Sequence, residues 1–377
     1  MQEIMFYSDF PFGYHNREAE ERMARFAGLG YTVHYVEKLG IRNPRPAQLR
    51  SVARRLAGRR APVREAAPPF EVVSPTLMPP RRAPLIDHLN RRWLARQLLR
   101  RLEEPGEAIL WLRFPTPEIV PLAQGPSFRL VVYEAVDDHR HGPGITPRLR
   151  RAFERAERAV LEEAGLVFAS SEPVFSRLAR LHPNVLLASA AAVEPAPFAA
   201  AGERAATPRR ALYAGSVDFR LDCALLAAAA RLLPDWTIAI AGPTTREAEA
   251  ELGAVTNIEL LGVRPAAEVP ALVGEAAVCL MPYRVSDYGD TLFPVKLVEY
   301  LASGRPVVST PIRAARDLAP VVALGGDPES FAEAVRRAAA EDSPASRAAR
   351  IAVAGEYSWE RRIAQMQSAV EEALARE

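Results

Sequence analysis

Lys296 and Glu299 stand three residues apart in the stretch MPYRVSDYGDTLFPVKLVEYLASGRPVVSTP. Pro294 before them and Gly304 after them predict a short helix, because proline favours the first helical turn and glycine favours the residue past the last one. On that helix the cation and the anion share one polar face near the N-terminus, where the helix dipole and free N–H groups favour phosphate. The pair therefore suits a ligand that carries a diphosphate and a hydroxylated ring.

Three more candidates for phosphate binding lie in the loop GSVDFRLD, which follows a predicted strand. Gly215 and Ser216 offer backbone N–H groups close to a helix start, and Arg220 offers a planar fork for phosphate oxygens. Two further loops, GPTT and SDYGDT, follow other strands of the same series. Because ligands bind at the carboxyl ends of parallel strands, we expect the three loops to converge on one nucleotide-diphosphate site.

The first half of the chain offers a second group of reactive side chains. His15 lies in the loop after the first predicted strand, and Asp137, Asp138, His139 and His141 lie just past a later strand. Carboxylates beside imidazoles can perform acid–base chemistry or bind a metal ion. Their spacing matches no defined metal motif, so we predict no metal site. Substrate contact, base catalysis and ordinary hydrogen-bonded loop structure all stay open for this group.

Composition excludes several classes of protein. At 377 residues the chain is long enough for two domains with their own cores, and its net charge of +2 gives no reason to expect nucleic acid as a partner. Cys223 and Cys279 lie in apolar surroundings, which favours buried free thiols in a reducing cytoplasm. The first residues predict a strand rather than a signal peptide, and no apolar run approaches the length of a membrane span.

The order of predicted strands and helices indicates an α/β protein of two doubly wound halves. We assign residues 1–190 to an N-terminal domain and residues 210–357 to a C-terminal domain. The Ala- and Pro-rich stretch 191–209 has little to bury and is predicted to be the linker. In the first half, RRWLARQLLRRL at 91–102 predicts a basic amphipathic helix. Such a helix either packs on its own domain or touches anionic lipid or an acidic partner.

The segment PVKLVEYLASGRPVVST, residues 294–310, resembles the donor-binding segment of glycosyltransferases with the two-Rossmann-domain (GT-B) fold, in particular family 4, the glycosyl transferases group 1. YAGSVDFRLD is similar to the first loop of that family's C-terminal domain, and YEAVDDH with LVFASSEPV resembles its N-terminal half. The resemblance covers most of the chain. It implies two Rossmann-like domains that face each other across a cleft, with a helix at 358–377 crossing back toward the first domain.

The resemblance also implies a function. The chain is expected to be a cytoplasmic glycosyltransferase that needs no metal ion and no cofactor, and that moves a sugar from a nucleotide-diphosphate donor to a hydroxyl acceptor. Glu299 is then expected to hold the ribose of the nucleotide sugar, and Arg220 and Lys296 to contact its diphosphate. The acceptor in the N-terminal domain is a small molecule, a polysaccharide or a lipid-linked molecule. The helix at 91–102 leaves peripheral contact with the inner membrane face open.

One departure from the family's pattern concerns the donor sugar. The family places a second glutamate eight residues before the ribose-binding one, where this chain has Thr291 with Asp290 beside it. Either Asp290 substitutes for that glutamate or the sugar is held differently. The identity of the sugar and the stereochemical outcome therefore stay open.

The catalytic residues depend on that outcome. An inverting enzyme needs a base for the acceptor's proton, and His15, Asp138 and His139 are the candidates, whereas a retaining enzyme can use the donor phosphate itself. Two other functions remain compatible with the sequence. One is a nucleotide-sugar 2-epimerase of the same fold, and the other is a non-catalytic nucleotide-sugar-binding protein, which Thr291 makes conceivable.

Overall fold

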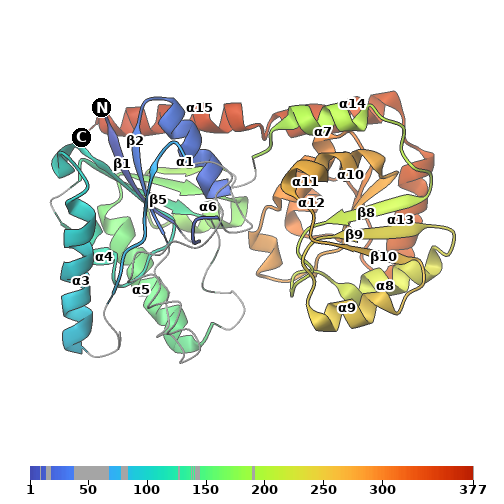
Figure 1. Ribbon diagram of the computed structural model, residues 1–377, viewed down its shortest axis with the longest axis horizontal. Coiled ribbons are helices and arrows are strands. Elements are labelled where there is room, and N and C mark those ends of the chain that lie inside the picture. Colours follow the sequence, from blue (N-terminus) through green and yellow to red (C-terminus); the bar gives the residue numbers. More distant parts are fainter. Residues whose placement is uncertain are drawn as a thin grey trace. The chain divides into compact units, whose positions relative to one another are not determined.

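The computed structural model divides into two compact units, each built around one sheet (Figure 1). Unit 1 consists of Met1–Ala188 and Ile363–Glu377, and unit 2 consists of Ser189–Arg362. The chain thus leaves unit 1 once and returns to it within its last helix. The residues that the structure describes are 1–8, 10–13, 18–37, 68–77, 84–125, 128–136, 138, 140, 145–188 and 192–376.

Unit 1 contains a parallel sheet of seven strands in the order β3-β2-β1-β4-β5-β6-β7. Short apolar runs such as EIMFY form these strands, because helices bury both faces of a parallel sheet. The strands are β1 (Glu3–Tyr7), β2 (Thr32–Val36), β3 (Glu71–Val73), β4 (Ile109–Leu112), β5 (Leu130–Ala135), β6 (Leu166–Ala169) and β7 (Val185–Leu187). The helices are α1 (Glu18–Gly28), α3 (Pro84–Leu99), α4 (Val120–Ala123), α5 (Pro147–Glu163), α6 (Glu172–Leu178) and α15 (Trp359–Leu374), which starts in unit 2.

Unit 2 contains a parallel sheet of six strands in the order β10-β9-β8-β11-β12-β13. The strands are β8 (Arg210–Ala214), β9 (Thr237–Ala241), β10 (Ile258–Gly262), β11 (Val278–Met281), β12 (Val307–Ser309) and β13 (Ala323–Leu324). The helices are α7 (Pro195–Gly202), α8 (Cys223–Leu232), α9 (Arg246–Gly253), α10 (Val269–Glu275), α11 (Val295–Ala302), α12 (Arg313–Asp317), α13 (Pro328–Ala340) and α14 (Pro344–Gly355). Two parallel, doubly wound units confirm the predicted fold class.

The stretch 191–209 differs from the linker that we predicted. It contains α7, which packs against α10 and α11 and buries Phe198 in the core of unit 2. Its small residues allow a close approach: a Cβ on Gly202 would lie 1.9 Å from the carbonyl oxygen of Ser303. On α10, a Cβ on Gly274 would lie 2.4 Å from the carbonyl oxygen of Ala201. The Ala-rich composition therefore reflects tight helix packing and not an exposed connection.

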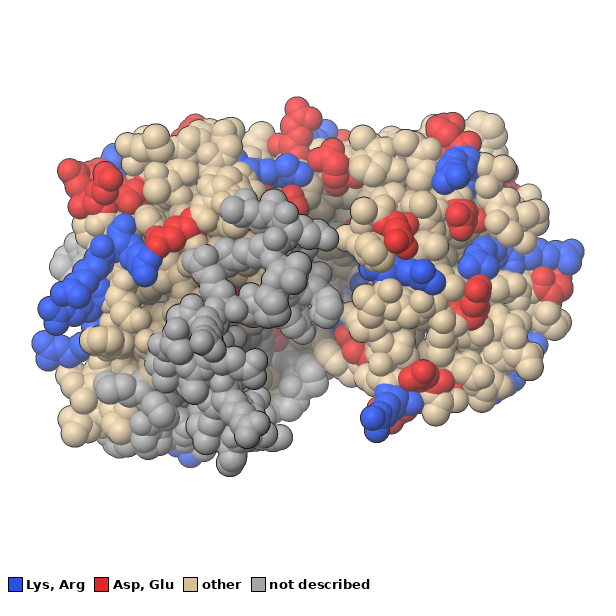
Figure 2. All heavy atoms as spheres, viewed as in Figure 1, with Lys and Arg blue, Asp and Glu red and all other residues tan. Residues whose placement is uncertain are grey.

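The surface and the helices give two further observations. Over unit 2, on the face that Figure 2 shows, Lys and Arg side chains mix with Asp and Glu side chains. No helix in the described ranges is long and apolar enough to cross a membrane.

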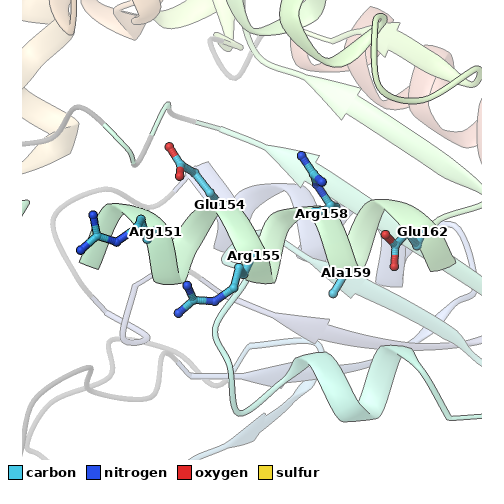
Figure 3. Close-up of a pocket in the computed structure, with 6 residues that line it drawn as sticks. All are labelled: Arg151, Glu154, Arg155, Arg158, Ala159 and Glu162. Atoms are coloured by element: carbon cyan, nitrogen blue, oxygen red, sulfur yellow. The ribbon is translucent and has the colours of Figure 1, made fainter. Parts of the chain in front are cut away.

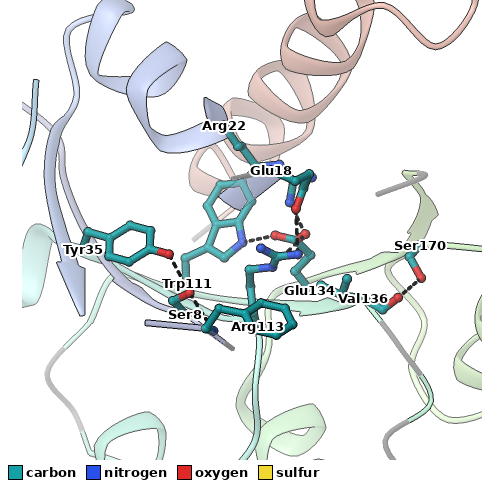
Figure 4. A network of polar contacts seen from close by, with 10 residues as sticks. Ser8, Glu18, Arg22, Tyr35, Trp111, Arg113, Glu134, Val136 and Ser170 are labelled. Atoms are coloured by element: carbon teal, nitrogen blue, oxygen red, sulfur yellow. Dashed lines mark hydrogen bonds and ion pairs between the residues drawn. The ribbon is translucent and has the colours of Figure 1, made fainter. Parts of the chain in front are cut away.

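Four buried charged side chains form a closed ring in unit 1 (Figure 4). Arg22 pairs with Glu18 and Glu134, and Arg113 pairs with the same two carboxylates at 2.8 Å and 3.3 Å respectively. The indole N–H of Trp111 donates to Glu134 at 2.9 Å. Because two cations alternate with two anions, each buried charge has compensating neighbours. The ring fixes the start of α1 against the carboxyl ends of β4 and β5.

Replacing Glu134 by glutamine should lower the free energy of unfolding by about 3–5 kcal/mol, because it leaves two buried guanidinium groups with one carboxylate. Urea denaturation followed by tryptophan fluorescence measures this change. The matched control is Glu107→Gln, which removes the exposed pair with Arg129 and should change stability by about 0.5 kcal/mol or less. Equal effects of the two substitutions would contradict a structural role for the ring.

Acid should weaken the same ring. Burial by itself raises the pKa of Glu134, but Arg22 and Arg113 more than reverse this, so its pKa lies below the ordinary value. A carboxyl group whose pKa is lower in the folded state than in the unfolded state stabilises the fold when it is ionised. This stabilisation is complete above the unfolded-state pKa of about 4.3 and is lost as the pH falls through the folded-state pKa. Stability measured against pH should therefore fall in that acid range, and the fall should be smaller in Glu134→Gln.

Candidate functional site

The candidate site lies in unit 2, where the strand order reverses between β8 and β11. At such a reversal the loops after the two strands diverge and leave room for a ligand at the carboxyl edge. In this protein two backbone hydrogen bonds nevertheless link the loop after β8 to the loop after β11. Asp222 N–H donates to the carbonyl of Pro282 at 2.8 Å, and Arg284 N–H donates to the carbonyl of Arg220 at 2.7 Å. The loop GSVDFRLD and the loop before α11 are thus held as one platform.

Helix α11 is anchored to the end of β8 by a buried tyrosine. The hydroxyl of Tyr300 accepts a hydrogen bond from the backbone N–H of Ala214 at 2.7 Å. The helix begins after Pro294, and no side chain caps its N-terminus. It ends at Ala302, and Gly304 just beyond it has a φ of 73°. Both predicted ends are confirmed. Tyr300 was not predicted from the sequence, although it lies one helical turn after Lys296.

Lys296 lies directly over Gly215. A Cβ at position 215 would lie 1.7 Å from Lys296 Cε and 2.5 Å from its Nζ, so only glycine leaves room for this side chain. Gly242 supports the same loop from the next strand: its φ is 146°, and a Cβ there would lie 2.1 Å from the carbonyl oxygen of Gly215. The Lys296 amine also lies 5.9 Å from the centre of the Tyr213 ring. The structure therefore brings together two of the three loops that we expected to converge, at Gly215 and Gly242, with Lys296 of α11.

The role expected for Gly215 requires a correction. Its N–H donates to the carbonyl of Ala241 at 2.7 Å, so it is occupied within the sheet edge and not free for phosphate. Helix α8 begins only at Cys223 and is capped by Asp222, so neither Gly215 nor Ser216 stands at a helix start. Gly215 contributes space for Lys296. Ser216 contributes its carbonyl, which accepts from the Tyr213 hydroxyl at 2.8 Å.

Glu299 is held three residues after Lys296 in a partly buried position. Burial raises the pKa of the Glu299 carboxyl, and the nearby Lys296 amine opposes this rise only in part. Within the described part of the chain, neither Lys296 nor Glu299 forms an ion pair or a side-chain hydrogen bond. A cation and an anion on one helical turn, neither of them held by an ion pair or a side-chain hydrogen bond within the described residues, are an arrangement that a ligand can complete.

Arg220 is held in a fork by Asp218. Its Nε and Nη2 donate to the two carboxylate oxygens of Asp218 at 2.9 Å and 2.6 Å, and its guanidinium carbon lies 5.9 Å from the centre of the Tyr283 ring. Burial lowers the pKa of Arg220, but the hydrogen bonds to Asp218 outweigh it and the net change is upward. The guanidinium therefore stays charged and fixed, with Nη1 not used by Asp218. The Asp-x-Arg spacing is a signal that the sequence offered and that we did not use.

Asp290 and Thr291 lie on the short 3₁₀ turn Gly289–Thr291 before α11. The Asp290 carboxylate accepts the backbone N–H of Arg313 at 2.8 Å and pairs with the Arg316 guanidinium at 3.1 Å. The Thr291 hydroxyl donates to the carbonyl of Tyr288 at 2.7 Å. Asp290 thus binds the first turn of α12. Its contact with a donor sugar stays a prediction.

The base candidates belong to unit 1. His15 and His139 lie outside the described residues. Asp138 is buried, and both of its carboxylate oxygens accept from Arg140, at 2.7 Å from Nε and 2.5 Å from Nη2. Burial raises the pKa of Asp138, but the Arg140 guanidinium and the Arg177 charge bring it far below its usual value. A carboxylate in this state is a weak proton acceptor, which argues against Asp138 as the base.

Unit 1 also carries a surface hollow of about 530 Å³ along α5 (Figure 3). Its lining residues among the described ones are charged except for one alanine, and all come from this one helix: Arg151, Glu154, Arg155, Arg158, Ala159 and Glu162. None of the predicted site residues is among them. A solvated helix face of mixed charge offers no convergent groups for chemistry, so we place no site there.

A comparison with known protein families matches the part of the chain that contains the unit 2 site. A sequence profile described as glycosyl transferases group 1 matches residues 208–341. The chain is also 35% identical over 101 residues to the putative teichuronic acid biosynthesis glycosyltransferase TuaH of Bacillus subtilis (strain 168). That alignment covers 26% of this chain and 25% of TuaH, so the chain spans about a quarter of the length of the curated relative that it matches.

Solved structures share the fold along the whole chain. HepE of Anabaena in complex with UDP gives a TM-score of 0.66 at 14% identity and covers 99% of this chain and 100% of its own. A UDP-forming α,α-trehalose-phosphate synthase of Burkholderia vietnamiensis gives 0.67 at 14% identity and covers 100% of both chains. At such identities the likeness establishes the fold alone. The matched residues 208–341 include every residue of the unit 2 site.

Proposed function

We propose that the protein is a glycosyltransferase that moves a sugar from a nucleotide-diphosphate donor to a hydroxyl acceptor. The observation that carries this proposal is the pair Lys296 and Glu299, which share one turn of α11 at the strand-order reversal and have no ion-pair partner among the described residues. Lys and Glu at this spacing pair readily on an ordinary helix surface. Two unpaired, partly buried charges cost stability, which a binding role explains.

The geometry supports the following proposed roles. Lys296 and Arg220 contact the diphosphate, together with the uncapped N–H groups at the start of α11. Glu299 accepts hydrogen bonds from the two ribose hydroxyls. We propose uridine diphosphate as the nucleotide, since HepE is known in complex with UDP and the Burkholderia synthase is described as UDP-forming. We assign the acceptor to unit 1. We assign the reaction to the cytoplasm, because Cys223 and Cys279 are buried free thiols.

The proposed reaction needs no metal ion. The acceptor hydroxyl attacks the anomeric carbon, the bond from that carbon to the diphosphate oxygen breaks, and negative charge grows on the diphosphate. Lys296 and Arg220 stabilise this charge, and Asp218 keeps the Arg220 guanidinium in place beforehand. We assign the acceptor's proton to the leaving diphosphate, because Asp138, the base candidate that the structure describes, is already held by Arg140.

A thermal-shift panel of nucleoside diphosphates tests donor binding, because a ligand that binds only the folded state raises the melting temperature. UDP should raise it, and Glu299→Ala should abolish the shift by removing the acceptor for the ribose hydroxyls. Without ligand, Glu299→Ala should be at least as stable as the parent, since burial disfavours the charged carboxylate. Glu333→Ala on α13, where the side chain is exposed, is the control that should keep the UDP response. An undiminished UDP response in Glu299→Ala would overturn the proposed donor site.

Gly215→Ala tests whether Lys296 must lie on the loop. The added methyl group should displace the flexible lysine without unfolding the protein, and UDP affinity should fall by about tenfold to a hundredfold, as expected for a lost charged hydrogen bond. Titration calorimetry of both single variants and of the Gly215→Ala/Lys296→Ala double variant completes the cycle. The double variant should bind no more weakly than Lys296→Ala.

Gly253→Ala is the matched control for this cycle, because a Cβ there meets only Leu260 Cδ1 at 3.9 Å. It should leave UDP affinity unchanged. Additive losses in the double variant would show that Gly215 acts independently of Lys296 and would contradict the proposed packing.

A further inference from the structure

Helix α3 of unit 1 has a buried face and an apolar face that is exposed. Asn90, Leu94 and Leu98 are buried against the unit. On the other side, Leu85 and Trp93 are 71% and 48% exposed, and Leu89 between them is 44% exposed. Their spacing of four residues places these three side chains in one stripe along the helix. The helix that we predicted at 91–102 thus starts and ends earlier, at Pro84 and Leu99, and Trp93 lies on its outer face.

The same outer face is strongly basic. Arg92, Arg96 and Arg100 are exposed, also at a spacing of four residues. Asp87 is the one acidic residue in the sequence of α3, and no acidic residue follows it up to Leu102. No ion pair joins these three arginines to a carboxylate elsewhere in the described ranges. Figure 2 shows basic side chains gathered where Figure 1 draws α3, at the edge of unit 1.

We propose that this face of α3, formed by Leu85, Leu89, Trp93 and the arginines Arg92, Arg96 and Arg100, docks on an anionic membrane surface. The leucines and the tryptophan enter the boundary between headgroups and acyl chains, as apolar and indole side chains of interfacial helices do. The arginines bind lipid phosphates. The helix lies in the plane of the membrane and does not span it.

Charge and apolarity together select this occupant. An acidic protein or a nucleic acid would satisfy the arginines but would leave the apolar stripe in water. A second copy of the chain could cover the stripe, but it would bring the same uncompensated arginines to the contact, where like charges repel. A bilayer containing anionic lipid offers negative charge and an apolar layer at adjacent depths. This proposal is independent of the donor site in unit 2.

Co-sedimentation of the full chain with vesicles tests the proposal. The protein should bind vesicles of phosphatidylcholine mixed with phosphatidylglycerol, bind pure phosphatidylcholine far more weakly, and lose affinity as salt is added. The triple variant Arg92→Gln/Arg96→Gln/Arg100→Gln should bind the mixed vesicles about a hundredfold more weakly, since each arginine near such a surface is worth about fivefold. Arg336→Gln/Arg337→Gln on α13 removes exposed arginines elsewhere and should bind like the parent.

The fluorescence of Trp93 reports whether α3 reaches the acyl chains of the bilayer. The other three tryptophans, Trp111, Trp236 and Trp359, are at most 7% exposed, so quenching by lipids brominated in the acyl chain should come from Trp93 and disappear in Trp93→Phe. Melting temperatures of all variants verify that they fold. Equal binding to neutral vesicles, an equal loss in the α13 control, or quenching that persists in Trp93→Phe would overturn the proposal. A concentration-dependent dimer that the α3 substitutions abolish would assign the face to a second copy instead.

Discussion

The site of unit 2 depends on the contact between α11 and the end of β8. The apolar stripe of α11 drives the helix onto the sheet, but hydrophobic burial has no direction and does not set where along the strand the helix stops. The hydrogen bond from Ala214 N–H to the Tyr300 hydroxyl sets that position. The next residue, Gly215, has to be a glycine. Lys296, one helical turn before Tyr300, occupies the space that a larger side chain at position 215 would need. Glu299 is carried into place by the same helix.

The charged ring of unit 1 and the site of unit 2 differ in how their charges are paired. In unit 1, Glu18, Arg22, Arg113 and Glu134 close a ring in which every member faces opposite charges. Such a ring stabilises one arrangement of α1 and leaves little for a ligand to gain. In unit 2, Lys296 and Glu299 lie close together without pairing. This part of the fold is therefore less stable than it would be if the two side chains formed an ion pair, as is common where a protein binds a charged ligand.

The same local fork occurs after a strand in each unit. Asp138 holds Arg140 as Asp218 holds Arg220, through Nε and Nη2 and through the backbone N–H of the arginine. A carboxylate two residues before an arginine reaches both donors without long-range help, which makes this feature readable from sequence. Its effect also changes the interpretation of Asp138, from a free acid–base group to a group that orients a guanidinium.

What the sequence determined by itself is local. The alternation of strands and helices specified two doubly wound units, and Pro294 and Gly304 marked the ends of α11, because backbone preferences and burial periodicity act within a few residues. The spacing of Lys296 and Glu299 was also enough to place both on one helical face. These features depend on neighbours in the chain, so a single sequence contains them.

Only the tertiary structure decided which segments approach each other closely. Small residues in the stretch 191–209 looked like a linker, whereas the folded chain uses them to pack α7 against α10 and α11. The sequence suggested that Gly215 offers a free N–H. In the folded chain this N–H donates to the carbonyl of Ala241, and Lys296 fills the space that a side chain at position 215 would take. In each case the deciding quantity is the space between residues far apart in the chain, which sequence spacing does not record.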